Sequence, residues 1–296
     1  MTPAPESAGT APIVPAVVDW FLENQRPLPW RGADPWGVLV SEFMLQQTPV
    51  HRVLPVWHDW QERWPTPSAL ADASVADALR AWGRLGYPRR ARRLHEAATA
   101  ITENHEGVVP DSEEELRALP GVGEYTAAAV MAFAYGRRSI VLDTNVRRVL
   151  ARAVEGRALP PAHVTTVERT SATALWPTSD DVSALWSASV MELGALVCTA
   201  RSPECDVCPL QSTCAWVRAG RPALAHVPRR QARFEGSDRQ VRGRIMALLR
   251  DADSFLTASA LAAAWPDAEQ RDRALAGLVA DGLVVRHGRG SYSLPE

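Results

Sequence analysis

The amino-acid sequence predicts an all-α protein, and three observations support this fold class. Apolar residues recur at helical spacing along roughly the first 220 residues. Ser74 with Asp77, and Ser112 with Glu115, have the spacing of a capping box, which starts helices. The alternation typical of strands is missing from this part of the chain. The predicted helices are 14–22, 36–45, 75–82, 90–101, 125–135, 146–154 and 182–196.

The last part of the chain has a different pattern. Residues 240–250 and 269–279 fit two helices, with a shorter one around 259–265. Residues 283–287 and 291–294 flank a Gly-Arg-Gly turn and predict a β-hairpin. Three helices followed by a hairpin resemble a winged-helix domain, a fold that binds DNA in some proteins and other proteins elsewhere. We therefore expect a loose tail at 1–13, a helical domain at 14–217, a linker at 218–238 and a winged-helix-like domain at 239–296.

Composition limits the cellular setting. Hydrophobic residues make up 46% of the chain, yet no uninterrupted apolar run approaches the roughly 20 residues that a bilayer span needs. The first residues are rich in proline and alanine and lack the pattern of a secretory signal. We therefore expect a cytoplasmic protein without a membrane partner.

The charges are unevenly distributed. The net charge of −2 argues mildly against a nucleic-acid partner, but residues 218–296 carry 13 of the 32 basic and only 9 of the 34 acidic residues. The helical part contains a run of arginines without a carboxylate among them: Arg80, Arg84, Arg89, Arg90, Arg92 and Arg93. The chain has no lysine, which excludes Schiff-base chemistry on a lysine side chain.

All four cysteines lie in one short stretch, with the spacing C-x6-C-x2-C-x5-C: Cys198, Cys205, Cys208 and Cys214. Two disulfides do not suit an intracellular protein. A structural zinc ion usually takes two C-x2-C pairs, and only one is present. Four thiolates in one loop therefore favour a [4Fe–4S] cluster over zinc, although ligand chemistry alone leaves both open.

A short loop, Leu119-Pro120-Gly121-Val122-Gly123, joins two predicted helices. Its two glycines permit a tight turn, and the start of the second helix offers free N–H groups to a phosphate. Taken by itself, the pattern fits an ordinary helix–helix turn better.

Seven stretches, in order, resemble the adenine DNA glycosylase family of the helix-hairpin-helix superfamily over about residues 14–216. They are LPWR (28–31), SEFMLQQT (41–48), GRLGY (83–87), LPGVGEYTA (119–127), LDTNVRRVLAR (142–152), MELGALVC (191–198) and the cysteine loop. The resemblance implies two helical lobes with double-stranded DNA and the active site between them. It also implies a [4Fe–4S] cluster on the cysteines, DNA contacts at Gly121, Val122 and Gly123, and a monomer at the bacterial nucleoid.

Glu42 lies within an apolar stretch, after Val40 and before Phe43. Cleavage of the N-glycosidic bond of adenosine is helped by protonation of the purine, and a buried carboxyl group keeps its proton near neutral pH. The pattern alone favours an exposed first-turn glutamate that complements the helix dipole. The resemblance implies instead that Glu42 is the general acid, a role that contributes about 10²–10⁴-fold.

Asp143 precedes a predicted helix and has the position of an N-cap. The resemblance implies that it also stabilises the oxocarbenium-like sugar, with support from Asn145. It further implies that Tyr125 stands where the related endonuclease III branch has a catalytic lysine that nicks the strand. Because the chain has no lysine, we expect a monofunctional glycosylase that leaves an intact abasic site.

Extrusion of a base leaves a gap that side chains must fill. The resemblance implies that four residues enter the duplex or contact the partner base: Gln46, Gln47, Thr48 and Tyr87. The arginine run would then lie near phosphates. Four residues would surround the extruded adenine: Leu28, Trp30, Arg31 and Glu192. A plain core role fits Leu28 and Trp30 about equally well.

The sequence departs from the family pattern in two places. Members commonly carry a C-terminal domain similar to Nudix hydrolases that recognises 8-oxoguanine, and the winged-helix-like part stands here instead. Pro88 occupies a position where a second tyrosine often follows, and proline fixes the local backbone. We expect adenine opposite 8-oxoguanine or guanine as substrate, with the preference between the two left open.

Two rival functions remain at this point. A mismatch thymine glycosylase of the same superfamily can share Tyr125, Asp143 and the cluster. A non-catalytic iron–sulfur regulator could bind DNA through the winged helix, although a pure binder needs neither Glu42 nor Asp143. A zinc nucleobase deaminase is excluded because no histidine begins an H-x-E motif.

Overall fold

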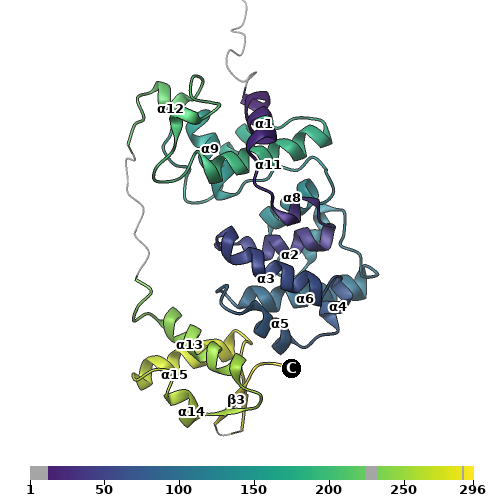
Figure 1. The fold of residues 1–296 in the computed structure, drawn as a ribbon, viewed down its shortest axis with the longest axis vertical. Helices are drawn as coiled ribbons and strands as arrows, with labels where there is room; N and C mark the ends of the chain where they lie inside the picture. The colour runs from purple at the N-terminus through teal and green to yellow at the C-terminus, as the bar shows by residue number, and fades with distance from the viewer. Residues whose placement is uncertain (1–12, 224–232, 289) are drawn as a thin grey trace, which may run out of the picture. The chain divides into compact units, whose positions relative to one another are not determined.

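The computed structural model describes residues 13–223, 233–288 and 290–296, and within these ranges the protein is mainly helical (Figure 1). The predicted tail, apart from its last residue, and the middle of the predicted linker lie outside the described residues. The described residues form two compact units, the first from 13–33 and 124–223 and the second from 34–123, 233–288 and 290–296. None of the described helices is long and apolar enough to cross a membrane.

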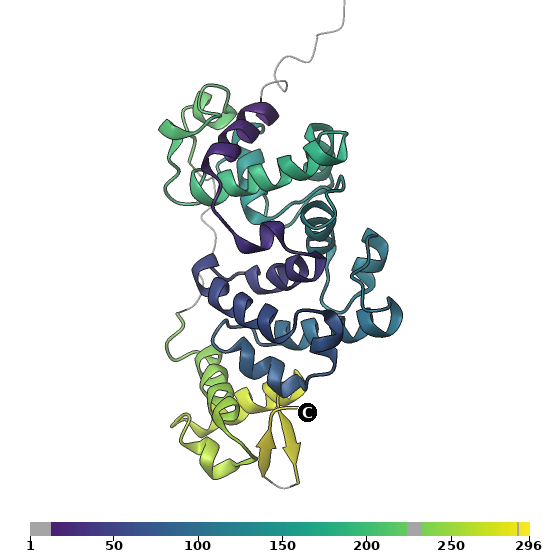
Figure 2. The same ribbon diagram turned by 45° about the vertical axis from the view of Figure 1, so that its right-hand side comes forward.

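The first unit consists of helices packed around α11. Its elements are α1 (Ile13–Asn24), α8 (Glu124–Phe133), α9 (Thr144–Ala153), α10 (Thr166–Leu175), α11 (Asp180–Leu196), α12 (Ala215–Arg218) and the 3₁₀ turns η1 (Pro29–Gly32) and η2 (Cys205–Val207). Helix α11 contacts α1, α8 and α9. The ribbons of α9 and α11 run beside each other in both views (Figures 1 and 2).

The core of the first unit explains why α11 is central. Trp186, Val190 and Leu193 recur on one side of α11 and are fully buried. The ring of Trp186 meets the ring of Trp176 edge to face, 6.1 Å between centroids. The indole N–H of Trp176 donates to Ser187 Oγ at 3.2 Å, which satisfies this buried donor.

The chain from 34 to 123 forms the helical part of the second unit. Its elements are α2 (Pro35–Leu45), α3 (Val50–Arg63), α4 (Pro67–Ala71), α5 (Val75–Trp82), α6 (Arg89–Asn104) and α7 (Glu113–Ala118). Helix α6 contacts α2, α4 and α5, and the ring of Trp60 packs edge to face on Trp64 and Trp82. Both predicted caps are confirmed, because Ser74 Oγ accepts from Asp77 N and Ser112 Oγ accepts from Glu115 N.

The C-terminal part has the predicted helices and hairpin. Its elements are α13 (Asp238–Asp251), β1 (Leu256–Thr257), α14 (Ala258–Ala262), α15 (Ala268–Ala280), β2 (Val285–His287) and β3 (Ser291–Ser293). The strands form an antiparallel sheet in the order β1-β3-β2, in which Tyr292 pairs with Leu256 on one side and Arg286 on the other. Strand β1 was not predicted. It turns the expected hairpin into a three-stranded sheet.

Candidate active site

Glu42 is buried in the middle of α2. Asp34 caps the helix by accepting from Gly37 N at 2.8 Å, and Pro35 occupies its first position. Every residue from Trp36 to Met44 is buried, and Glu42 itself is only 5% exposed. The alternative interpretation of Glu42 as an exposed first-turn glutamate is therefore wrong. Glu42 is thus a buried residue inside a helix, and its role as a general acid stays a prediction.

Asp143 caps helix α9, as predicted. One carboxylate oxygen accepts from Val146 N at 2.6 Å, and the other accepts from Asn145 Nδ2 at 2.8 Å. Burial raises the pKa of Asp143 above its ordinary value, while these two donors and the charge of Arg148 oppose that shift. The structure thus brings Asp143 and Asn145 together and gives the carboxylate direct hydrogen-bond partners.

Arg148 extends this network and was missed by the sequence analysis. Its Nη2 donates to Asn145 Oδ1 at 2.8 Å and to the carbonyl of Gly194 at 2.5 Å, and its Nε donates to the carbonyl of Cys198 at 2.7 Å. Gly194 allows α11 to approach α9 closely, since a Cβ atom there would lie 2.7 Å from the Cβ of Asn145. Asn145 is therefore fixed by Arg148 on one side and by the backbone of α11 on the other.

Glu192, on α11, binds two arginines. Arg26 donates from its backbone N and its Nε to Oε1, both at 2.9 Å, and from Nη2 to Oε2 at 2.6 Å; Arg31 lies 3.1 Å from Oε2. Burial acts to raise the pKa of Glu192, but the hydrogen bonds from Arg26 and the charge of Arg31 outweigh it and lower the pKa. Glu192 is thus held as a carboxylate. Arg26 is a second partner that the sequence analysis did not identify.

The other predicted site residues of the first unit occupy different settings. Trp30 is 7% exposed and belongs to the core, whereas Leu28 is half-buried just before η1. Tyr125 is half-buried in the first turn of α8 and packs against the core of this unit. Both tyrosine and tryptophan carry a polar group that reaches beyond an apolar ring.

The predicted DNA-contacting turns lie in the second unit. Gln46 and Gln47 follow α2, and Tyr87, 48% exposed, precedes α6. Thr48 is buried, so its side chain points inward. These residues come together with Glu42 in one unit, while Asp143, Asn145, Tyr125 and Glu192 belong to the other.

The hairpin loop at 119–123 requires glycine at one position. Gly121 has φ +81°, and a Cβ atom there would lie 2.8 Å from Arg93 Cβ and 2.9 Å from the ring of Phe43. Val122 is buried and donates its N–H to the carbonyl of Leu119 at 3.1 Å. Gly123 immediately precedes α8, so the loop ends at a helix N-terminus.

The arginine run differs from its expected role in one respect. Arg80 pairs with Asp77, and Arg92 and Arg93 both pair with Glu96. Arg90 is 9% exposed and donates to main-chain carbonyls. Arg90 is therefore an internal residue, and the expectation that the whole run faces phosphates is wrong for it.

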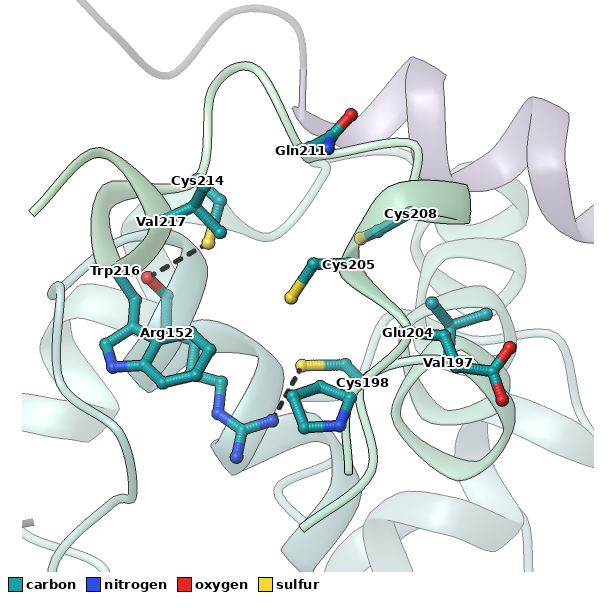
Figure 3. A pocket seen from close by; sticks show the side chains of 11 residues that line it. Arg152, Val197, Cys198, Glu204, Cys205, Cys208, Gln211, Cys214, Trp216 and Val217 are labelled. Carbon is teal, nitrogen blue, oxygen red and sulfur yellow. Dashed lines mark hydrogen bonds between the residues drawn. The ribbon is translucent and has the colours of Figure 1, made fainter. Parts of the chain in front are cut away.

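The four cysteines line one pocket in the first unit (Figure 3). Figure 3 shows their sulfur atoms facing a shared space, with Arg152 and Trp216 at its edge. Arg152 is 4% exposed, donates to Cys198 Sγ at 3.4 Å, and lies 4.8 Å from the centre of the Trp216 ring. Burial raises the pKa of Cys208 to about 11 and also raises that of Cys198.

This pocket fits an iron–sulfur cluster. Four sulfurs around one space supply the thiolate ligands of a cluster, and an N–H donor beside a sulfur is typical of cluster surroundings. The loop also matches the iron–sulfur binding domain of endonuclease III over residues 198–214. The cofactor is therefore an iron–sulfur cluster, and all four cysteines lie within the matched loop.

Comparison with known proteins identifies the family. Residues 40–169 match the HhH-GPD superfamily of base excision DNA repair proteins. An adenine DNA glycosylase of Mycobacterium tuberculosis is 55% identical over 279 residues, which cover 93% of this chain and 91% of the relative. That of Mycolicibacterium smegmatis is 52% identical over 281 residues, 94% of each chain. The chain belongs to the adenine DNA glycosylase family.

The adenine DNA glycosylase family also has sister branches that this chain resembles. A thymine-DNA glycosylase of Aeropyrum pernix is 34% identical over 202 residues, covering 67% of this chain and 91% of the relative. The structure of a thermostable thymine-DNA glycosylase superposes with a TM-score of 0.63 at 25% identity, over 70% of this chain and 95% of that one. These matches support the two-lobed glycosylase fold. As an adenine DNA glycosylase, the protein is a base-excision enzyme that hydrolyses the N-glycosyl bond of adenine in DNA.

Proposed function

We propose that the substrate is adenine opposite 8-oxoguanine or guanine in duplex DNA. The main support is a pair of carboxyl groups suited to cleavage of a glycosidic bond. The chain combines a carboxyl group buried inside α2, Glu42, with a hydrogen-bonded carboxylate at the start of α9, Asp143. Pairs of carboxyl groups in contrasting environments are typical of enzymes that cleave glycosidic bonds. The identity of the relatives supports adenine as the base released.

In this proposal Glu42 donates a proton to the purine ring, which makes adenine a better leaving group. Burial penalises the charged form of a carboxyl group, and the side chain of Glu42 is buried. The electrons of the N-glycosidic bond then move to the base, and the sugar becomes cationic. Glu42 needs no covalent contact with the sugar for this step.

Asp143 stabilises the cationic sugar, either covalently or as a charge, before water attacks. Asn145 and the N–H of Val146 hold its carboxylate in one orientation. Tyr125 occupies the position at which a lysine would form a Schiff base, so no strand cleavage follows. The proposed product is an intact abasic site.

The DNA contacts are divided between several elements. Gln46, Gln47 and Tyr87 would fill the gap left by the extruded base, with Thr48 beneath them. Gly121, Val122 and Gly123 would contact phosphates at the start of α8. Leu28, Trp30, Arg31 and Glu192 would surround adenine, with Glu192 fixed as a carboxylate by Arg26 and Arg31.

We further propose that the iron–sulfur group is a [4Fe–4S] cluster and that the enzyme is a cytoplasmic monomer at the nucleoid. When bound, a cluster with four thiolate ligands cross-links the loop from Cys198 to Cys214. The chain itself positions this loop through Arg152 and Arg148, which bind its carbonyls. The proposed domains are the glycosylase domain at 14–217 and the winged-helix-like domain at 239–296, joined by the linker at 218–238.

The deciding experiment measures base release from duplexes with A:8-oxoguanine, A:G, G:T or A:T, with and without hot alkali. We expect adenine release from the first two, with strand cleavage only after alkali. Cleavage without alkali would contradict the monofunctional mechanism. Release of thymine from G:T alone would support the sister branch, which the likeness to thymine-DNA glycosylases makes the second candidate.

A further inference from the structure

Two turns of the second unit hold backbone in an unfavourable conformation. Gln47 has φ +55° and Tyr87 has φ +47°, in the left-handed region that residues with a Cβ atom rarely adopt. Gln47 follows α2, and Tyr87 lies between α5 and α6. The surrounding structure must therefore hold both turns in place. These are the turns whose side chains enter the duplex in the proposed function.

One buried guanidinium group binds both turns. Arg90, in the first turn of α6, donates from Nη1 to the carbonyls of Phe43, Met44 and Gln46 at 2.8, 2.9 and 2.7 Å. Its Nη2 donates to Thr48 Oγ1 at 2.9 Å and to the carbonyl of Gly86 at 3.1 Å. The first acceptors belong to the end of α2 and the turn after it, and Gly86 directly precedes Tyr87. Arg90 therefore joins two segments that are about 40 residues apart in the chain.

The charge of Arg90 suits this position. Burial lowers the pKa of its guanidinium to about 10, so the group remains a cation at neutral pH. The last carbonyls of α2 carry the negative end of the helix dipole. The guanidinium carbon also lies 5.2 Å from the centre of the Trp82 ring and 5.5 Å from that of Tyr87, distances at which a cation attracts an aromatic ring.

We propose that Arg90 is a positioning residue for base extrusion, which fixes the Gln47 turn and the Tyr87 turn relative to each other before DNA binds. This inference rests on the proposed function, in which both side chains enter the duplex. A wedge that is already ordered loses less conformational freedom when the base is extruded. Lysine cannot replace Arg90, because a single ammonium group lacks the fork that reaches both turns at once.

The test compares Arg90→Lys with the wild-type holoenzyme on two A:G duplexes. In one the mispair is flanked by G·C pairs, and in the other by A·T pairs, which open more easily. We expect single-turnover adenine release by Arg90→Lys to fall about 10- to 100-fold with G·C flanks and clearly less with A·T flanks. A partly misfolded variant would lose the same factor on both duplexes. Arg63→Lys, which alters an exposed arginine paired with Asp59, is the matched control and should leave both rates unchanged.

A second variant tests the same role in case Arg90→Lys does not fold. Thr48→Val removes one acceptor of Nη2 at nearly constant volume, and we expect a smaller loss with the same dependence on the flanks. If a folded variant shows an equal loss on both duplexes, or no loss, the positioning role of Arg90 is wrong. The proposed function would not be affected by that result. If the wild-type enzyme releases no adenine from either duplex, the proposed function fails and this inference fails with it.

Discussion

Helix α2 and the start of α9 hold the two carboxyl groups of the proposed mechanism in contrasting ways. Glu42 lies in the middle of a helix whose residues from Trp36 to Met44 are all buried. Asp143 lies at a helix end, where Val146 and Asn145 donate to its two oxygens. The chain thus buries one carboxyl group inside a helix and gives the other N–H donors at a helix end, where burial still raises its pKa. The contrast follows from position along a helix rather than from residue type.

Glu42→Gln tests the first half of this contrast and should have the largest effect. Glutamine has the same shape but cannot donate the proton, so we expect base release to fall about 10²–10⁴-fold. Binding to an A:G duplex, measured by fluorescence anisotropy, should persist. Glu62→Gln, at an exposed position of α3, is the control. Unchanged turnover in Glu42→Gln would remove Glu42 from the mechanism.

Asp143→Asn separates capping from catalysis at the other site. Asparagine keeps the cap to Val146 N but loses the hydrogen bond from Asn145 Nδ2, so the free energy of unfolding should fall by only about 1 kcal/mol. Base release should fall about 10²–10³-fold, because the charge is lost. Asp34→Asn makes the same change at the cap of α2 and should leave the rate unaltered. Equal activity of the two variants would show that Asp143 is only a cap.

The pH dependence of the Asn145→Ala variant tests whether the hydrogen bond from Asn145 lowers the pKa of Asp143. In the proposed mechanism Asp143 acts as a carboxylate, and burial raises its pKa, so activity should be present above that pKa and lost as the pH falls through it. The hydrogen bond from Asn145 lowers the pKa. Its removal should shift the acid limb of the rate profile to higher pH, with a larger loss of activity on the acid limb than at the alkaline end of the profile. Asn104→Ala, on the surface of α6, serves as control. An unshifted acid limb would contradict the assignment.

Ser74→Ala should have the smallest effect, because the cap of α5 has no chemical role. We expect a loss of about 1 kcal/mol in the free energy of unfolding and unchanged base release. Urea unfolding monitored by circular dichroism measures the first quantity, and single-turnover kinetics the second. A fall in base release larger than the unfolded fraction explains would mean that α5 takes part in more than folding.

The sequence predicted helices well where apolar periodicity is strong. Residues 75–82 were predicted as a helix and form α5 with the same bounds. Helices α3, α4 and α10 were not predicted: α3 contains Pro55 in its interior, α4 has only five residues, and α10 is rich in threonine and alanine. Strand β1 has two residues and exists through its pairing with β3, a long-range contact that local pattern does not reveal.

Some residues of the candidate site also could not be predicted from the sequence, for a different reason. Glu42, Asp143 and the cysteines stand in recognisable motifs, and Asp143 also has the signature of a helix cap. Arg26, Arg90 and Arg148 were missed as partners, since their roles depend on which atoms they meet. Arg90 and Arg148 donate mainly to main-chain carbonyls. Because every residue has such a carbonyl, these bonds cannot be predicted from residue type.

The absent side chain of Gly194 provides a criterion for sorting related chains. Even one methyl group at this position would overlap Asn145, the residue that orients Asp143. A homologue with alanine or a larger residue there must either have moved α11 away from α9 or have displaced the asparagine. A larger residue at this single position therefore marks a chain in which the surroundings of the asparagine differ from those seen here.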